Sequence, residues 1–214
     1  DSTVPTLTSV SIASTNSTST LVKHGEDVVL TFTASETIGT PVVTFLSGGA
    51  AITDGLINYS NTSGNTWTAT YDVRYSDTEG AVTFSVAFSD TVGNAGTAVT
   101  VVTDGTSVTF DKTPPTISEV TAITTPTNDN TPSYVFTTNE AGAISSSNSL
   151  TGDVTAEVGN NTIIFDTLDD GTYDSVTVTV TDAAGNASNS LSVTTFVVDT
   201  TAPTFTNSPD SVTV

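Results

Sequence analysis

The stretch Val28-Val-Leu-Thr-Phe-Thr-Ala34 decides the fold class, because its side chains alternate with a period of two. Its even positions are all apolar, and two of its three odd positions are threonine. An extended strand sends successive side chains to opposite faces, so this pattern places one face in a core and the other in water. The stretch therefore predicts a half-buried antiparallel strand.

The same alternation recurs at residues 67–73, 82–89 and 176–181. Trp67 is in phase with the apolar residues of its stretch, so we expect it in the core. Glycine and proline separate the short runs, and no run has a helical period of useful length. Roughly six to eight short strands per unit are typical of an all-β, immunoglobulin-like sandwich with Greek-key topology. The other all-β solution is a closed barrel.

Two local signals add detail to this prediction. Asp54-Gly55 lies between two short apolar runs and is a typical two-residue hairpin sequence. The first strand of each half also breaks its alternation in the same way, between Leu7 and Val10 and between Ile117 and Val120. The shared break predicts a β-bulge or a change of sheet in both strands.

One six-residue phrase divides the chain into repeats. It reads Asp1-Ser-Thr-Val-Pro-Thr6, then Asp111-Lys-Thr-Pro-Pro-Thr116, then Asp199-Thr-Thr-Ala-Pro-Thr204. The proline leads into an edge strand, where a missing N–H costs little. We therefore expect one immunoglobulin-like repeat at residues 1–112, a second at 113–200 and the start of a third at 201–214. Each of the first two is large enough to bury its own core.

The charge balance restricts the possible partners. The chain has 23 acidic and 3 basic residues, for a net charge of −20. This field repels nucleic acid and anionic lipid and favours cations, although an acidic surface also serves solubility. No apolar run approaches the roughly 20 residues that span a bilayer, so we expect no direct membrane insertion. The absence of cysteine excludes disulfides and fits an exported, extracellular or cell-surface protein.

Two further acidic signals recur in register with the phrase. A glutamate follows the second strand of each unit, and Asp-x-x-Gly-Asn follows the penultimate strand. If strands alternate up and down in a sandwich, these segments and the linker aspartate meet at one pole. The predicted metal ligands are Asp1, Glu36, Asp90 and Asn94 at the head of the first unit, Asp111, Glu140, Asp182 and Asn186 at the junction, and Asp199 in a partial third site.

Calcium is the expected ligand of these clusters. Unpaired carboxylates about 5 Å apart repel by roughly 1 to 3 kcal/mol per pair, and a hard cation reverses the sign. Ca²⁺ accepts six to eight oxygen ligands in loose geometry, and glycine lets a loop present its carbonyls. Taken alone, Asp-x-x-Gly-Asn is also an ordinary Asx-type turn. The acidic turns at 77–80 and 169–171, at the opposite pole, are plain turns or a source of additional ligands.

The combination of motifs resembles a known family. Ser89-Asp-Thr-Val-Gly-Asn94 with the phrase at 111–116, and Thr181-Asp-Ala-Ala-Gly-Asn186 with the phrase at 199–204, are similar to bacterial immunoglobulin-like repeats of large, repetitive surface adhesins. Residues 128–142 resemble the same family, so the similarity covers essentially the whole chain. It implies stalk or extender modules, often with calcium at the junctions.

We therefore expect a non-enzymatic extender segment whose partners are neighbouring repeats. The single histidine, His24, lies in a turn, and no catalytic arrangement is recognisable around it. One alternative is a subunit of a self-assembling surface layer or filament that contacts other copies laterally. Another is a carbohydrate-binding module, which needs clustered exposed aromatic residues, and Tyr59 and Tyr75 are the candidates.

Overall fold

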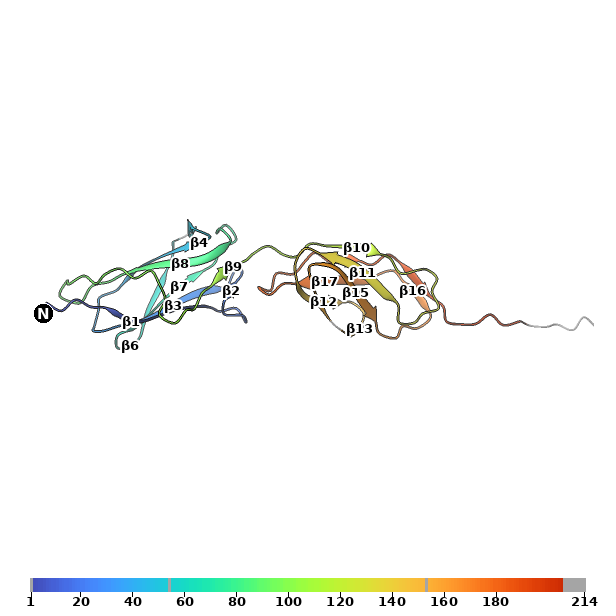
Figure 1. The fold of residues 1–214 in the computed structure, drawn as a ribbon, viewed down its shortest axis with the longest axis horizontal. Coiled ribbons are helices and arrows are strands. Elements are labelled where there is room, and N and C mark those ends of the chain that lie inside the picture. The colour runs from blue at the N-terminus through green and yellow to red at the C-terminus, as the bar shows by residue number, and fades with distance from the viewer. Residues whose placement is uncertain (1, 54, 153, 206–214) are drawn as a thin grey trace, which may run out of the picture. The chain divides into compact units, whose positions relative to one another are not determined.

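The computed structural model describes residues 2–53, 55–152 and 154–205. These residues form two compact units, which are Asp1–Thr113 with Ala183–Asn186, and Pro114–Asp182 with Ala187–Val214. Both units are built from β-strands, and the described residues contain no helix (Figure 1). The prediction of all-β, immunoglobulin-like sandwiches is confirmed. Most of the segment predicted to start a third repeat lies outside the described residues.

Two sheets make up the sandwich of the first unit. One sheet has the order β1 (Leu7–Ser14), β3 (Asp27–Ala34), β7 (Thr66–Asp72) and β6 (Asn58–Ser63). The other has the order β2 (Leu21–Val22), β9 (Thr109–Phe110), β8 (Gly80–Ala87), β4 (Val42–Ser47) and β5 (Ala50–Ala51). All pairs are antiparallel except β2 with β9.

The core of the first unit lies where the alternation predicts it. The even-numbered residues of β3 are buried, with Leu30 and Phe32 both 0% exposed. Tyr71 of β7 is also fully buried, and Phe45 of β4 packs against its ring. Trp67 is half-buried and packs against this core, as its phase indicates.

The second unit has its own sheets. The first has the order β10 (Ile117–Thr121), β11 (Ser133–Thr138), β15 (Gly159–Phe165) and β13 (Leu150–Thr151). The second has the order β14 (Thr155–Ala156), β12 (Gly142–Ser146), β17 (Thr177–Thr181) and β18 (Leu191–Ser192), and a two-stranded sheet pairs β16 (Gly171–Tyr173) with β19 (Phe196–Val198). Tyr134, Phe136, Phe165 and Phe196 lie at 0% exposure in its core.

One local prediction is confirmed, and one falls on a residue that the structure does not describe. The register shifts between Leu7 and Ser9 in β1, and again between Glu119 and Thr121 in β10, so the expected irregularity is present in both first strands. The predicted hairpin turn at Asp54-Gly55 includes Asp54, which lies outside the described residues. On either side of it, β5 pairs with β4 and β6 pairs with β7.

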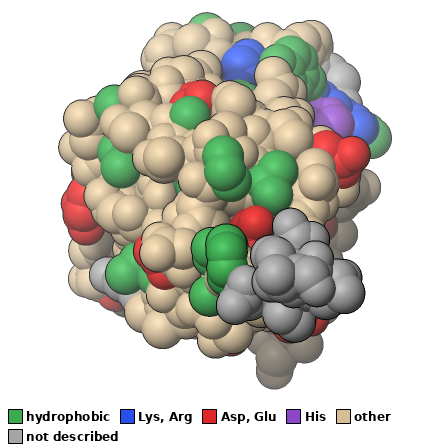
Figure 2. Space-filling view, turned by 90° about the vertical axis from the view of Figure 1, so that its right-hand side faces the viewer, with side chains coloured by type: hydrophobic (Ala, Val, Ile, Leu, Met, Phe, Trp, Pro, Cys, Tyr) green, Lys and Arg blue, Asp and Glu red, His purple; other side chains and the backbone are tan. Residues whose placement is uncertain are grey.

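The acidic side chains lie almost entirely outside the strands. Among the described residues, the acids within strands are Asp27, Asp72 and Glu119. Serine and threonine cover the solvent faces of the sheets, because they suit a pleated surface and remain hydrated. Figure 2 shows one end of the molecule, where most of the visible surface is neither hydrophobic nor charged and carboxylates are scattered. The negative charge is therefore concentrated in the loops that join the strands.

Candidate functional site

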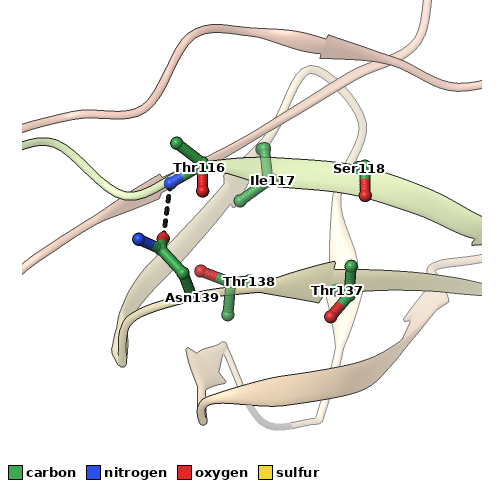
Figure 3. Close-up of a pocket in the computed structure, with 6 residues that line it drawn as sticks. All are labelled: Thr116, Ile117, Ser118, Thr137, Thr138 and Asn139. Atoms are coloured by element: carbon green, nitrogen blue, oxygen red, sulfur yellow. Dashed lines mark hydrogen bonds between the residues drawn. The ribbon is translucent and has the colours of Figure 1, made fainter.

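In the second unit, the strand pairing brings the predicted segments to one pole. Ile117 at the start of β10 pairs with Thr138 at the end of β11. Just before this pair, the Thr116 N–H donates to Asn139 Oδ1 at 2.6 Å (Figure 3). The other sheet ends at the same pole, since Ala143 at the start of β12 pairs with Thr181 at the end of β17. The loops that follow β11 and β17 are therefore neighbours.

Glu140 and Asp182 belong to these two loops. One carboxylate oxygen of each lies within 4.8 Å of the other. Thr138 fixes the loop of Glu140, because its hydroxyl donates to the Glu140 carbonyl at 2.8 Å and accepts the Glu140 N–H at 3.3 Å. Two carboxylates at this distance repel in water, and a shared divalent cation would bind both.

A shallow hollow of about 290 Å³ lies beside this pole. It is lined by Thr116, Ile117, Ser118, Thr137, Thr138 and Asn139 (Figure 3). Its lining has hydroxyl and amide groups but no carboxylate, so it offers a cation only neutral ligands. The hollow therefore does not itself form the predicted metal site.

The first unit contains Asp111 together with residues 183–186. The Asp111 N–H donates to the Val22 carbonyl at 3.0 Å, and its Oδ1 accepts the Thr113 N–H at 3.0 Å. Asn186 Nδ2 donates to the Asp111 carbonyl at 3.2 Å. Asn186 thus binds the backbone of a predicted ligand through its amide nitrogen.

Sequence reasoning missed two residues that hold the 183–186 segment. Asn16 Nδ2 donates to the Ala184 carbonyl at 2.8 Å, and Lys23 Nζ donates to the Gly185 carbonyl at 2.9 Å. Gly185 has a φ of +89°, a conformation that residues with a side chain rarely adopt, so glycine is favoured at this position. The sequence predicts that this glycine helps to present carbonyls to an ion, and here its carbonyl meets a lysine.

The corresponding loop of the first unit is closed by Asp90. Asp90 Oδ1 accepts the N–H groups of Val92 at 3.0 Å and Asn94 at 2.8 Å, and Oδ2 accepts Asn94 Nδ2 at 2.7 Å. Burial raises the pKa of Asp90, but hydrogen bonds from Asn94 and from the loop backbone outweigh it, so the pKa lies below 3.8. Gly93 has φ +101°, which explains its place in the motif. The Asp-x-x-Gly-Asn spacing is thus explained locally as an Asx-type turn.

Glu36 lies at the same pole as this loop. The neighbouring Ser35 exchanges hydrogen bonds with Thr6, and Ile38 forms a β-bridge with Asp90. Within the described residues, which leave out Asp1, neither Glu36 nor Asp90 belongs to a group of three acidic or histidine side chains near enough to share a metal. Their role as ligands stays a prediction.

The acidic turn at 77–80 contains a buried carboxylate. Asp77 is 2% exposed, and its Oδ1 accepts the N–H and the hydroxyl of Thr53, both at 2.8 Å. Its Oδ2 accepts the Arg74 N–H at 2.8 Å. Asp77 therefore ties the segment after β5 to the turn after β7, which is a structural role.

The aromatic candidates for sugar stacking do not form a cluster. Tyr59 packs partly against the core, and the Val43 N–H donates to its hydroxyl at 2.9 Å. Tyr75 is 65% exposed, and Lys112 Nζ lies 5.2 Å from the centre of its ring. Each tyrosine thus has its own neighbours, and the pair offers no common stacking face.

The fold defines the class as two immunoglobulin-like sandwiches in tandem. Residues 115–200 match the model of the bacterial Ig-like domain family, so the second unit is similar to the domains of that family. Domains of this family are typically non-enzymatic and structural, and they often occur in extracellular or surface proteins. The described residues contain no helix of the length and apolarity that crossing a membrane requires.

Among the solved structures that match this chain are fragments of titin and of DIP-gamma. The I-band fragment I67–I69 from titin is 15% identical with a TM-score of 0.44, and the match covers 89% of this chain and 66% of the titin fragment. DIP-gamma IG1+IG2 is 14% identical with a TM-score of 0.40, and the match covers 91% and 98% of the two chains. A search of curated proteins finds no match to this sequence.

Proposed function

We propose that this chain is a non-enzymatic extender segment of an extracellular, repetitive surface adhesin, stiffened by calcium where one repeat follows another. The observation that carries the calcium proposal is the pair of carboxylates of Glu140 and Asp182, with oxygens within 4.8 Å. The proposed ligands are this pair together with Asp111, the aspartate of the linker. Glu36 and Asp90 with Asp1, and Asp199, are the equivalent proposed ligands in the other copies.

The charge distribution supports this proposal. Most acids lie in the loops at the strand ends, so the negative field is concentrated in the loops and not over the sheets. Carboxylates that lie close together in these loops, such as those of Glu140 and Asp182, repel one another in the absence of cations. Calcium removes that repulsion by binding carboxylates from more than one segment.

A calcium titration tests the proposal directly. Calcium is expected to raise the melting temperature, by the equivalent of about 2.7 kcal/mol at a concentration of 100 times Kd. Asp182→Ala is expected to remove most of this effect. Asp129→Ala is the matched control, because the Asp129 carboxylate accepts the N–H and hydroxyl of Thr131 in its own turn. The proposal fails if calorimetry detects no binding at millimolar calcium, or if both variants lose the same stabilisation.

One surface favours lateral assembly into a layer or filament as the second candidate function. The outer face of the sheet β1-β3-β7-β6 presents two rows of hydroxyls across four strands. The rows are Ser11, Thr31, Thr68 and Ser60, and Ser9, Thr33, Thr66 and Ser63. The rows themselves carry no charge, and Asp27 and Asp72 pair with each other nearer one end of the same sheet. Copies of a protein with a net charge of −20 repel one another least over such uncharged rows.

Sedimentation velocity over a range of protein concentrations tests lateral assembly. If this face mediates contact, Ser11→Glu with Ser60→Glu is expected to weaken self-association by about tenfold or more, because carboxylates of two copies would meet. Thr44→Glu with Thr83→Glu is the control, since it adds the same charge to the other sheet. A wild-type chain that stays monomeric at every concentration contradicts the second candidate.

A further inference from the structure

Each sandwich binds the linker that leaves it through an acidic side chain. In the first unit, Glu79 lies just before β8 and Asp111-Lys-Thr113 follows β9. Glu79 Oε1 accepts the Lys112 N–H at 2.7 Å. The Thr113 hydroxyl lies 2.8 Å from Glu79 Oε1 and 2.9 Å from Oε2. One carboxylate thus binds the second and third residues of the linker.

The second unit repeats this contact with a different acid. Asp170 lies just before β16, and Asp199-Thr-Thr201 follows β19. Asp170 Oδ1 accepts the Thr200 N–H at 2.8 Å and the Thr200 hydroxyl at 2.7 Å. Its Oδ2 accepts the Thr201 hydroxyl at 2.6 Å. The backbone of the second linker residue and the hydroxyl of the third are again bound by one carboxylate.

The aspartate that begins each linker also binds the backbone of the linker. Asp111 Oδ1 accepts the Thr113 N–H at 3.0 Å, and Asp199 Oδ1 accepts the Thr201 N–H at 3.1 Å. In the first unit, Lys112 Nζ also donates to the carbonyls of Tyr75 and Asp77, both at 2.8 Å. All these contacts lie within one unit, so they do not depend on the unit that follows.

We infer that Glu79 and Asp170 are linker clamps, which fix the direction in which the chain leaves each sandwich without a bound metal. Hydrogen bonds to a carboxylate are charge-assisted and therefore stronger than neutral ones. The clamp explains why the repeated phrase has a threonine two residues after its aspartate. Glu79 binds the hydroxyl of Thr113, and Asp170 binds the hydroxyl of Thr201. The extender role gives the clamp its purpose, but the clamp itself rests on contacts inside each unit.

The pH dependence of the clamp follows from its charges. Burial raises the pKa of Glu79, but hydrogen bonds from the Lys112 N–H and the Thr113 hydroxyl, with the Lys112 charge and Asp111, bring it below 4.5. The hydroxyls of Thr201 and Thr200 bring the pKa of Asp170 below 3.8, with Asp169 and Asp199 as its acidic neighbours in the chain. A lowered pKa means that the stabilisation is complete above the ordinary value and is lost as the pH falls through the lowered one. Both clamps are therefore closed at neutral pH.

Amide hydrogen exchange by NMR, with EDTA present, tests the inference. The N–H groups of Lys112 and Thr200 are expected to be protected in the wild-type chain. Glu79→Ala is expected to speed exchange at Lys112 on the order of tenfold or more and to leave Thr200 unchanged. Asp170→Ala is expected to do the reverse.

Two further variants keep the test specific. Thr113→Val removes the hydroxyl but leaves the Lys112 N–H bond, so it is expected to have a smaller effect than Glu79→Ala. Asp104→Ala is the control, because Asp104 binds the N–H and hydroxyl of Thr106 in a loop away from the linker. Unchanged protection of the Phe32 amide shows that a variant of the first unit is folded, and unchanged protection of the Phe136 amide shows the same for Asp170→Ala. Glu79→Gln replaces Glu79→Ala if the alanine variant is not folded.

Two results would overturn the clamp. One is rapid exchange at Lys112 and Thr200 in the wild-type chain with EDTA, and the other is equal exchange in the wild type and the folded clamp variants. Protection that appears only after calcium is added also contradicts it, because the clamp is proposed to need no metal. A failed calcium titration would remove the calcium proposal and leave the clamp intact, so the two failures are distinguishable.

Discussion

Replacing Phe136 with alanine is expected to lower the free energy of unfolding of the second unit by about 3 to 5 kcal/mol. Phe136 lies on β11 at 0% exposure, and its ring centroid is 6.5 Å from that of Tyr134. Truncation removes the transfer free energy of the ring and leaves a cavity that the two packed sheets cannot fully close. Because a domain of this size is stable by only about 5 to 15 kcal/mol, the loss is a large fraction of the total.

Differential scanning calorimetry measures the loss and where it falls. Each unit has its own core, so only the transition of the second unit is expected to shift. Ile164→Ala is the matched control: Ile164 lies on the adjacent β15 and is 43% exposed, so its truncation is expected to cost about 1 kcal/mol or less. Equal losses in the two variants, or equal shifts of both transitions, would contradict the prediction.

The period-two pattern predicts this core correctly because burial on one face is a local property of a strand. Val176, Val178 and Val180 all lie at 3% exposure or less, as their alternation indicates. The same pattern does not specify which strands pair, because partners such as β3 and β7 are separated by a long stretch of chain. The Greek-key order was predictable only as a class, from the number and spacing of the strands.

A two-residue hairpin turn forms at Gly48-Gly49, a position not predicted from the sequence. The φ angles of these glycines, +55° and +82°, fit such a turn. A Cβ at Gly48 would lie 2.1 Å from the Glu79 carbonyl oxygen, so the tertiary structure requires glycine there. This turn pairs β5 with β4, and after β5 the Thr53 N–H donates to Asp77.

The candidate site could be predicted in part for a similar reason. Glu140 and Asp182 follow strand ends, and alternating strand directions bring those ends to one pole. The contact of Asn16 with Ala184 and the contact of Glu79 with Thr113 each join segments that are distant in sequence. Ala184 and Thr113 lie in repeated motifs, but no motif indicates which residues are their partners. Such side-chain partners depend on loop conformation, which the strand pattern does not determine.

Asp77→Ala is expected to destabilise the first unit by about 2 to 4 kcal/mol, since it removes three hydrogen bonds to a buried carboxylate. The N–H groups of Thr53 and Arg74 both lose their acceptor. Water can reach them in part, because both residues are exposed at the surface, and this limits the cost. Chemical denaturation monitored by Trp67 fluorescence reports on this unit alone, since Trp67 is the single tryptophan of the chain.

Asp77→Asn separates the role of the charge from that of the shape. An asparagine oxygen can still accept from Thr53, but its amide group faces the Arg74 N–H with a donor and cannot replace Oδ2. We therefore expect Asp77→Asn to be less stable than the wild type and more stable than Asp77→Ala. If the asparagine variant is as stable as the wild type, the Arg74 contact contributes nothing. If both variants are as stable as the wild type, the hydrogen bonds of Asp77 to Thr53 do not stabilise the first unit, and the path of the chain after β5 has another cause.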